Sequence, residues 1–232
     1  MRREVSLEDL KKLYSSNDMV KADCQGCHGC SDCCQGMGES IILDPFDVYR
    51  LRENLKVSFE ELLAGYIELN VVDGVILPHL KMNGKRDACT FLNEEGRCSI
   101  HPFRPGLCRL FPLGRYYEKD GFRYFLQKEE CKKANKSKVK VSKWLDMPNL
   151  KQYEGYVNRW HYFLEKVEAL ITEAADEQLK KDLNMYLLEQ FFIKSYSGER
   201  EFYAQVEERI LQAEKLIKVL KIPSDTKEDM VK

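Results

Sequence analysis

The chain has 232 residues, 44% of them hydrophobic and 32% charged, which predicts one or two globular domains with a sizeable core. A formal net charge of −1 gives no overall field for nucleic acid or an anionic membrane, so we expect neither as a partner. The sequence has no apolar run of membrane-spanning length and no signal-peptide core, so we expect a cytoplasmic protein.

The N-terminal part predicts one helix and one strand around a cysteine-rich loop. Residues 1–20 predict a short helix behind Ser6. Its apolar residues recur at helical spacing: Leu7, Leu10, Leu13 and Tyr14. After the loop, Ile41–Leu43 is an apolar run short enough for a buried strand.

Two helix starts follow. Asp44 is a favourable N-cap and Pro45 fits the first helical turn. The expected buried face of this helix comprises Phe46, Tyr49, Leu51 and Leu55. Ser58 and Glu61 form a capping box, which predicts a second helix running to Tyr66.

Three hairpins are predicted between the cysteine-bearing segments. Apolar alternation and an Asp-Gly turn predict the first over residues 67–77. The second is expected to turn at residues 93–96, which would bring Cys89 and Cys98 together on facing arms. The third is expected to turn at residues 119–121. Together these hairpins would carry the distant cysteines back to the first loop.

The C-terminal part changes to helical periodicity after Pro148. Three apolar stripes recur at this spacing: Tyr153, Tyr156, Trp160, Phe163, Leu164, Val167 and Ile171; Leu179, Leu183, Tyr186, Leu187 and Phe191; Phe202, Val206, Ile210 and Ile217. We expect an antiparallel helical region over residues 146–222, able to bind an unknown protein partner, and a flexible tail over 223–232. The six lysines between Lys132 and Lys143 predict a solvated connector or a patch for an acidic partner.

Nine cysteines mark a separate domain over residues 1–145, with its motifs in 24–131. Five of them lie within eleven residues: Cys24, Cys27, Cys30, Cys33 and Cys34. The other four are Cys89, Cys98, Cys108 and Cys131. A two-residue spacing lets two sulfurs reach one metal, as in zinc knuckles and iron–sulfur loops. Disulfides would need an oxidising compartment, so we expect metal binding.

The adjacent pair, Cys33 and Cys34, departs from the two-residue spacing. Neighbouring side chains of an extended chain point apart, so we expect this pair to serve two centres, or one of the two to serve none. Cys27 and Cys30 are expected to share one centre.

Four segments carry a family resemblance. A C-x-x-C-x-x-C-C run at residues 27–34 precedes I-x-L and D-x-x-R-L elements at 41–51. C-x-F-L and G-x-C-S-I elements follow at 89–100, and an R-P-x-x-C-R-x-F-P box follows at 104–112. In this order they resemble the YkgJ-like CxxCxxCC cysteine cluster family, described as a zinc- or iron-chelating domain.

This resemblance implies a ligand set and a class of role. The metal ligands that it implies are Cys27, Cys30, Cys33, Cys34, Cys89, Cys98, Cys108 and Cys131. Cys24 is an addition to that set. Members of the family are labelled iron–sulfur oxidoreductases, and flagellin lysine methylases are similar to it in their cysteine cluster. The resemblance therefore implies a redox or catalytic role.

Charged neighbours of the cysteines are further candidates. Arg104 and Arg109 flank Cys108 and are expected to bind the cofactor by offsetting thiolate charge, although most arginines simply lie at the surface. His28 and His101 lie beside cysteines and are alternative ligands, but the thiols suffice without them.

Two functions follow from these observations, within an α+β fold in which a small cysteine-rich domain of short helices and hairpins precedes a mostly helical region. The first is an iron–sulfur protein, with a 4Fe–4S cluster favoured because eight thiols exceed the need of one zinc. The second is a structural zinc module, because a closed four-thiolate zinc site has no open position for chemistry.

Overall fold

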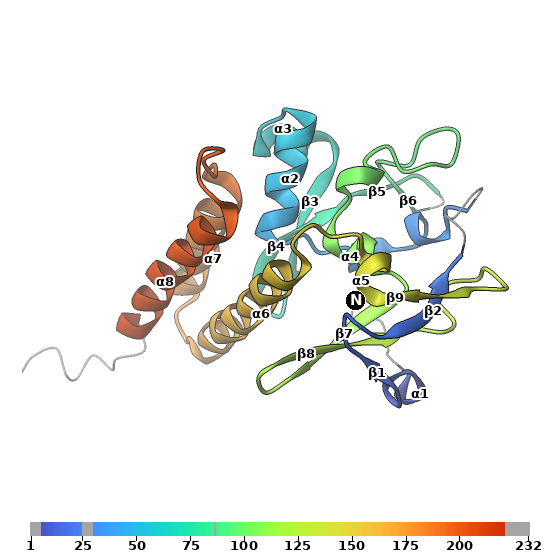
Figure 1. The fold of residues 1–232 in the computed structure, drawn as a ribbon. Helices are drawn as coiled ribbons and strands as arrows, with labels where there is room; N and C mark the ends of the chain where they lie inside the picture. Colours follow the sequence, from blue (N-terminus) through green and yellow to red (C-terminus); the bar gives the residue numbers. More distant parts are fainter. Residues whose placement is uncertain (1–5, 25–29, 86, 221–232) are drawn as a thin grey trace, which may run out of the picture. The chain divides into compact units, whose positions relative to one another are not determined.

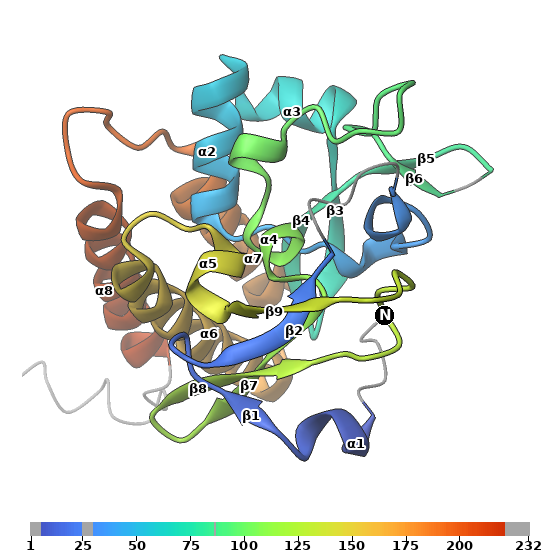
Figure 2. The same ribbon diagram turned by 45° about the vertical axis from the view of Figure 1, so that its right-hand side comes forward.

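The computed structural model describes residues 6–24, 30–85 and 87–220, which form an α+β fold (Figures 1 and 2). The chain divides into two compact units. The first comprises Met1–Asn70 and Leu77–Glu154, and the second comprises Val71–Ile76 and Gly155–Lys232. The fold class expected from the sequence is confirmed. The domain boundaries expected after residues 145 and 222 stay a prediction.

Short antiparallel strands form much of the first unit. They pair as one three-stranded sheet, in the order β1-β8-β7, and as the two-stranded sheets β2-β9 and β5-β6. Their bounds are β1 (Leu13–Tyr14), β2 (Met19–Asp23), β5 (Met82–Asn83), β6 (Ala88–Cys89), β7 (Leu113–Glu118), β8 (Gly121–Leu126) and β9 (Ser137–Lys140). One core cluster joins several of these strands to two helices: Tyr14, Val20, Ala22, Leu110, Leu113, Tyr124, Val141 and Leu145.

Helices of the first unit are short. They are α1 (Leu7–Leu10), α2 (Pro45–Leu55), α3 (Phe59–Gly65), α4 (Gly106–Leu110) and α5 (Val141–Leu145), with 3₁₀ turns η1 (Asp32–Cys34), η2 (Gly38–Ser40) and η3 (His101–Phe103). Asp44 and Ser58 each close a capping box, so both predicted helix starts are confirmed. Of the four residues expected on the buried face of α2, Leu51 is fully buried, and Val48 joins it.

The predicted hairpins at residues 67–77 and 119–121 are confirmed. The first consists of β3 (Ile67–Val72) and β4 (Val75–Leu80), and the second joins β7 to β8. Asp73 and Gly74 have φ angles of 50° and 87°, as a two-residue turn with both central residues at positive φ requires. The predicted turn at residues 93–96 is closed by a bridge between Leu92 and Cys98.

Two local predictions are wrong. Ser6 caps α1, but the helix ends after one turn, and Leu13 and Tyr14 form β1, opposite Phe125 and Tyr124 of β8. Pairing with β8 buries Tyr14, and this tertiary contact outweighs the helical spacing. The run Ile41–Leu43 makes a single bridge, from Ile42 to His79, in place of a strand, although Ile41 and Leu43 are buried.

The lysine-rich stretch contains structure that its composition did not predict. Residues Ser137–Lys140 form β9, which pairs antiparallel with β2 so that Val139 lies opposite Val20. Helix α5 follows directly, with Val141 and Leu145 buried. The stretch is therefore partly integrated in the first unit.

Long helices form most of the second unit, which confirms the predicted helical region. They are α6 (Leu150–Glu173), α7 (Glu177–Leu188), a π-helical turn η4 (Glu189–Ile193) and α8 (Phe202–Leu220). Asp176 caps α7 by accepting from Gln178 N at 2.8 Å. Trp160 lies 5.0 Å from Phe191 between ring centroids, and Phe163 packs on the same ring. The tail expected over 223–232 lies outside the described residues.

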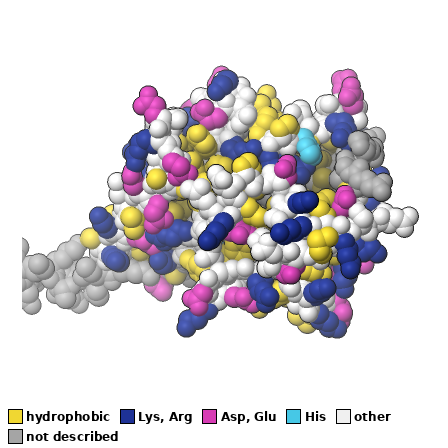
Figure 3. Space-filling model, in the orientation of Figure 1, with side chains coloured by type: hydrophobic (Ala, Val, Ile, Leu, Met, Phe, Trp, Pro, Cys, Tyr) yellow, Lys and Arg dark blue, Asp and Glu magenta, His cyan; other side chains and the backbone are white. Residues whose placement is uncertain are grey.

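Within the described residues, none of the helices combines the length and the apolar character that crossing a bilayer requires. On the face that Figure 3 shows, basic and acidic side chains are interspersed.

Candidate metal centre

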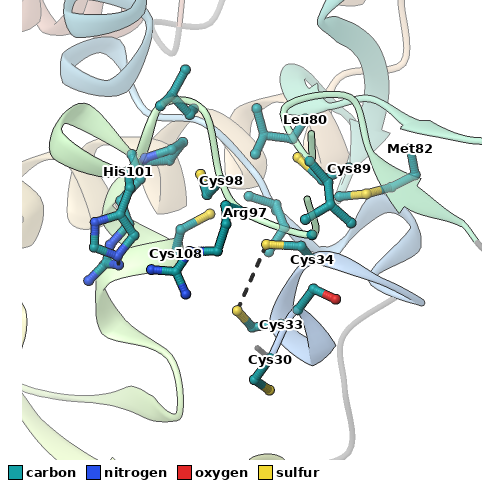
Figure 4. Close-up of a pocket in the computed structure, with 17 residues that line it drawn as sticks. Cys30, Cys33, Cys34, Leu80, Met82, Cys89, Arg97, Cys98, His101 and Cys108 are labelled. Carbon is teal, nitrogen blue, oxygen red and sulfur yellow. Dashed lines mark hydrogen bonds between the residues drawn. The ribbon is translucent and has the colours of Figure 1, made fainter. Parts of the chain in front are cut away.

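Six thiols line one cavity in the first unit. The cavity has a volume of ≈ 100 Å³. Its cysteines are Cys30, Cys33, Cys34, Cys89, Cys98 and Cys108 (Figure 4). They come from the segment around η1, from β6, from the strand-like arm after residue 96 and from α4. The fold therefore brings together cysteines that are up to 78 residues apart in the sequence, Cys30 and Cys108 being the outermost.

Backbone contacts tie the first cysteine segment to the β5–β6 hairpin. Gln35 forms a bridge with Ala88, and Gly36 N donates to Asp87 O at 2.9 Å. Gly38 N donates to the Asp87 carboxylate at 2.7 Å. These contacts bring Cys33 and Cys34 beside the strand that carries Cys89, which is buried.

The adjacent cysteines do not point apart. The Sγ atoms of Cys33 and Cys34 lie 3.9 Å apart (Figure 4), so the geometric reason for assigning them to different centres is wrong. The two residues lie in a 3₁₀ turn, in which successive side chains differ by about 120° rather than the near-reversal of a strand. Two sulfurs about 2.3 Å from one tetrahedral ion would lie about 3.8 Å apart, close to the observed distance.

A second cavity of ≈ 160 Å³ adjoins the first. Its cysteines are Cys24, Cys30, Cys33, Cys108 and Cys131. Cys30, Cys33 and Cys108 line both cavities and form a shared wall. All eight cysteines that the structure describes therefore line one or the other cavity, and the predicted ligand Cys27 lies outside the described residues.

Thiol pKa values reflect burial and crowding. The hydrogen bond with Cys34 lowers the pKa of Cys33 to about 7, and the same bond, together with burial, raises the pKa of Cys34. Burial raises the pKa of Cys89 and Cys98 and raises that of Cys108 well above its usual value, with neighbouring thiols adding to the effect for each. Without a cation most of these thiols would hold their protons, so a metal must displace protons to bind.

Arg104 lines both cavities. Its positive charge favours the thiolate forms of Cys33 and Cys98. Its Nε atom is buried and has no hydrogen-bond partner in the part of the chain that the structure describes. His101 is exposed and contacts the Arg104 guanidinium through Nε2, and His28 lies outside the described residues.

Arg109, the second predicted charge partner, is buried and bonded to backbone. Its guanidinium donates to Asp146 O at 2.7 Å, to Leu145 O at 3.5 Å and to Pro102 O, and its Nε donates to Arg104 O at 3.3 Å. These bonds tie the loop before α4 to the end of α5.

A buried carboxylate holds the start of α4 in place. It was not among the site residues predicted from the sequence. Asp47 Oδ1 accepts from Gly106 N at 2.8 Å, two residues before Cys108. A Cβ on Gly106 would lie 2.0 Å from the Tyr153 hydroxyl, which also accepts from Arg115 at 3.2 Å. The sequence signal was Asp47 at the third position of its helix, but nothing in the sequence pairs it with Gly106.

The donor set fits a soft metal. Within residues 6–24, 30–85 and 87–220, no three His, Cys, Asp or Glu side chains already converge on a single ion position. The first cavity nevertheless combines six thiols with apolar residues such as Ile41, Leu80 and Ile100, and with the Arg104 guanidinium. Thiolates in an apolar wall favour zinc or iron–sulfur clusters over hard cations.

Comparison with known families agrees with this chemistry. The family model described as "CxxCxxCC: Putative zinc- or iron-chelating domain" matches residues 26–143. No curated protein and no solved structure matches the chain significantly. The family match covers half of the sequence and includes the segments that carry seven of the eight described thiols. The chain belongs to the CxxCxxCC family of zinc- or iron-chelating domains, and its cysteine cluster binds metal.

Proposed function

We propose that the first cavity holds an iron–sulfur cluster in a redox or catalytic role. The observation that carries this proposal is the cavity itself, in which six thiols surround ≈ 100 Å³. One water-sized sphere needs only about 10–15 Å³, so the space exceeds what a single ion fills. A four-iron cluster takes four thiolate ligands, and this lining can supply them.

Charge balance supports the same centre. Four thiolates on an oxidised four-iron cluster leave about two negative charges. Arg104 lies beside the thiols, and its buried Nε–H has no partner among the described residues, which suits donation to a cluster sulfur. We assign the predicted charge-balancing role to Arg104, because the donors of Arg109 already bond to carbonyl oxygens.

What the cluster would supply is electron transfer or an activating site on iron. The chain's own residues would hold the cluster, exclude water with Ile41 and Leu80, and donate a hydrogen bond from Arg104. The reaction would be an oxidation or a lysine methylase-like transfer.

A structural zinc module is the second candidate. The 3.9 Å separation of the Cys33 and Cys34 sulfurs favours it, because this spacing suits two ligands of one tetrahedral ion. In that case the cluster of thiols would stabilise the first unit without chemistry of its own.

Metal analysis of protein purified without oxygen tests the proposal. We expect iron together with acid-labile sulfide, and visible absorption that dithionite bleaches. Arg104→Gln should shift the reduction potential to more negative values, because the oxidised cluster carries less negative charge than the reduced one and so needs the arginine less. Arg123→Gln, an exposed arginine of β8, is the matched control. Stoichiometric zinc without sulfide would select the zinc module instead.

A further inference from the structure

The two adjoining cavities divide the thiols unequally. Cys34, Cys89 and Cys98 line only the first cavity, whereas Cys24 and Cys131 line only the second. We propose that Cys24, Cys30 and Cys131 hold a second metal ion in the second cavity, separate from the centre in the first. This proposal rests on the proposed function only in placing metal on these thiols, and not on the identity of the metal.

Strand pairing explains why Cys24 and Cys131 meet although 106 residues separate them. Cys24 directly follows β2, and Cys131 lies in the segment that leads into β9. The two strands are antiparallel, and Asp23 lies opposite Ser137, whose hydroxyl donates to the Asp23 carboxylate at 3.0 Å. This end of the β2–β9 pair therefore fixes both cysteine segments at the same cavity.

A further bond holds the Cys131 segment against β9. Lys136 Nζ donates to Cys131 O at 2.7 Å, which closes the turn between Cys131 and the strand. The Cys131 side chain is partly buried and lines the cavity. Cys30 reaches the same cavity from the segment before η1.

The charge of the second cavity suits metal-bound thiolates. Arg104, Lys132 and Lys133 line it, against one carboxylate, that of Asp32. This excess of positive charge offsets the negative charge that several thiolates leave on a divalent ion.

Aromatic residues form part of the same wall. Phe111 and Trp144 line the cavity, and Trp144 Nε1 donates to Phe111 O at 3.1 Å, so the indole is held in place. An apolar wall strengthens the attraction between a thiolate and a cation.

The shared wall completes both coordination sets. Cys33 and Cys108 lie in both linings, so either can supply a fourth ligand to the second ion. The first cavity then keeps Cys34, Cys89 and Cys98 together with the remaining shared thiol. Cys24, which the family pattern does not include, gains a role that its position after β2 explains.

Cobalt(II) titration of the full metal-free chain under anaerobic conditions tests the proposal. The thiolate charge-transfer absorption should saturate at two equivalents in the wild type. It should saturate at one equivalent in Cys24→Ser, in Cys131→Ser and in the double variant, because these two changes remove the same ion. Cys89→Ser, on the other side of the shared wall, should also bind one equivalent. The combination of Cys24→Ser with Cys89→Ser should bind none.

Thiol alkylation of the wild type provides a readout that does not depend on folding of a variant. Cobalt loading should protect Cys24 and Cys131 from iodoacetamide, as measured by peptide mass spectrometry. Two equivalents in Cys24→Ser, one equivalent in the wild type, or unprotected Cys24 in the loaded wild type would each overturn the second site. Because these counts use cobalt alone, they stand apart from the iron and sulfide analysis that decides the proposed function.

Discussion

The two units of the chain differ in the interactions that stabilise them. The first unit contains every cysteine that the structure describes, on strands of two to six residues and on helices of four to eleven. The second unit contains helices of 12 and 19 residues and most of a 24-residue helix, with Phe163, Phe191 and Ile210 completely buried. Both units bury apolar side chains, but among the described residues only the first also gathers thiols.

This difference has a physical basis. Isolated two-stranded sheets and single-turn helices are at best marginally stable in water, so the first unit depends on what links its pieces. Those links include the hydrophobic cluster around Tyr14 and Leu113, together with the Asp87 and Asp47 bonds, the Arg109 carbonyl contacts and the thiols. Long amphipathic helices need only bury their apolar stripes against one another. We therefore expect bound metal to stabilise the first unit, and its removal to leave the second unit folded.

Removing the metal should separate the two units most strongly. Structural thiolate sites contribute about 10–16 kcal/mol of apparent binding free energy in zinc-finger peptides, as much as a whole domain's stability of about 5–15 kcal/mol. We expect the first unit to lose hydrogen-exchange protection in chelator or in Cys108→Ser, which removes a thiol of the shared wall. Residues 155–220 should keep their protection.

Thr90→Ser is the control for this experiment. Thr90 lies next to Cys89, and its hydroxyl contact with Tyr66 O is one that serine can retain. Equal loss of protection in both units would show that they do not differ in metal dependence.

The reverse experiment truncates the helical core. Phe191 is completely buried against Trp160 and Phe163, so Phe191→Ala should cost about 3–5 kcal/mol of unfolding free energy. The loss should be confined to the second unit, with metal content unchanged. Met185→Ala, an exposed site on α7, should be nearly neutral in the same urea denaturation. Loss of metal from Phe191→Ala would contradict the separation.

Substitutions of two glycines test close packing in the first unit against open space in the second. Gly106→Ala places a Cβ 2.0 Å from the Tyr153 hydroxyl, and the forced shift should cost about 1–3 kcal/mol. It should also weaken metal binding, since α4 carries Cys108. Gly155→Ala meets no atom within 4 Å and should stabilise α6 by about 0.5–1 kcal/mol. Thermal melts and chelator competition measure both, and a tolerated Gly106→Ala would show that α4 can move.

The stability of the two units should depend on pH in opposite directions. We expect this to be the smallest of the predicted effects. Hydrogen bonds from Arg159, joined by one from Lys166, lower the pKa of Glu214 from 4.5 to about 2, although partial burial acts in the opposite direction. That contribution is present above pH 4.5 and is lost as the pH falls toward 2, so the second unit should weaken in acid and Glu214→Gln should flatten this dependence.

Whatever structure the first unit retains without metal should instead weaken in alkali. Burial raises the pKa of Cys89 and Cys108 above 9.0, so the folded state holds protons that the unfolded state releases as the pH rises past 9.0. Hydrogen exchange at both pH extremes measures the two slopes, and parallel slopes would contradict the comparison.

Local sequence signals determined much of the fold. Asp44, Ser58 and Asp176 begin helices because a side chain satisfies backbone donors within three residues, and this chemistry needs no distant partner. Asp73-Gly74 closes a hairpin because both residues adopt positive φ, which is also a local property of the chain. The three apolar stripes after Pro148 predicted helices because their period is a property of the chain itself. The cysteine spacing likewise indicated metal without any structure.

Only the tertiary structure decided how distant segments combine. Leu13 and Tyr14 became a strand because β8 was there to pair with them, and the lysine-rich stretch yielded β9 because β2 offered an edge. The 3₁₀ turn that brings the Cys33 and Cys34 sulfurs together reverses an inference from sequence adjacency. The separation of the thiols into two cavities also depends on pairing between strands far apart in the sequence. Spacing along a chain fixes which ligands exist, but contacts across the fold fix which of them can share an ion.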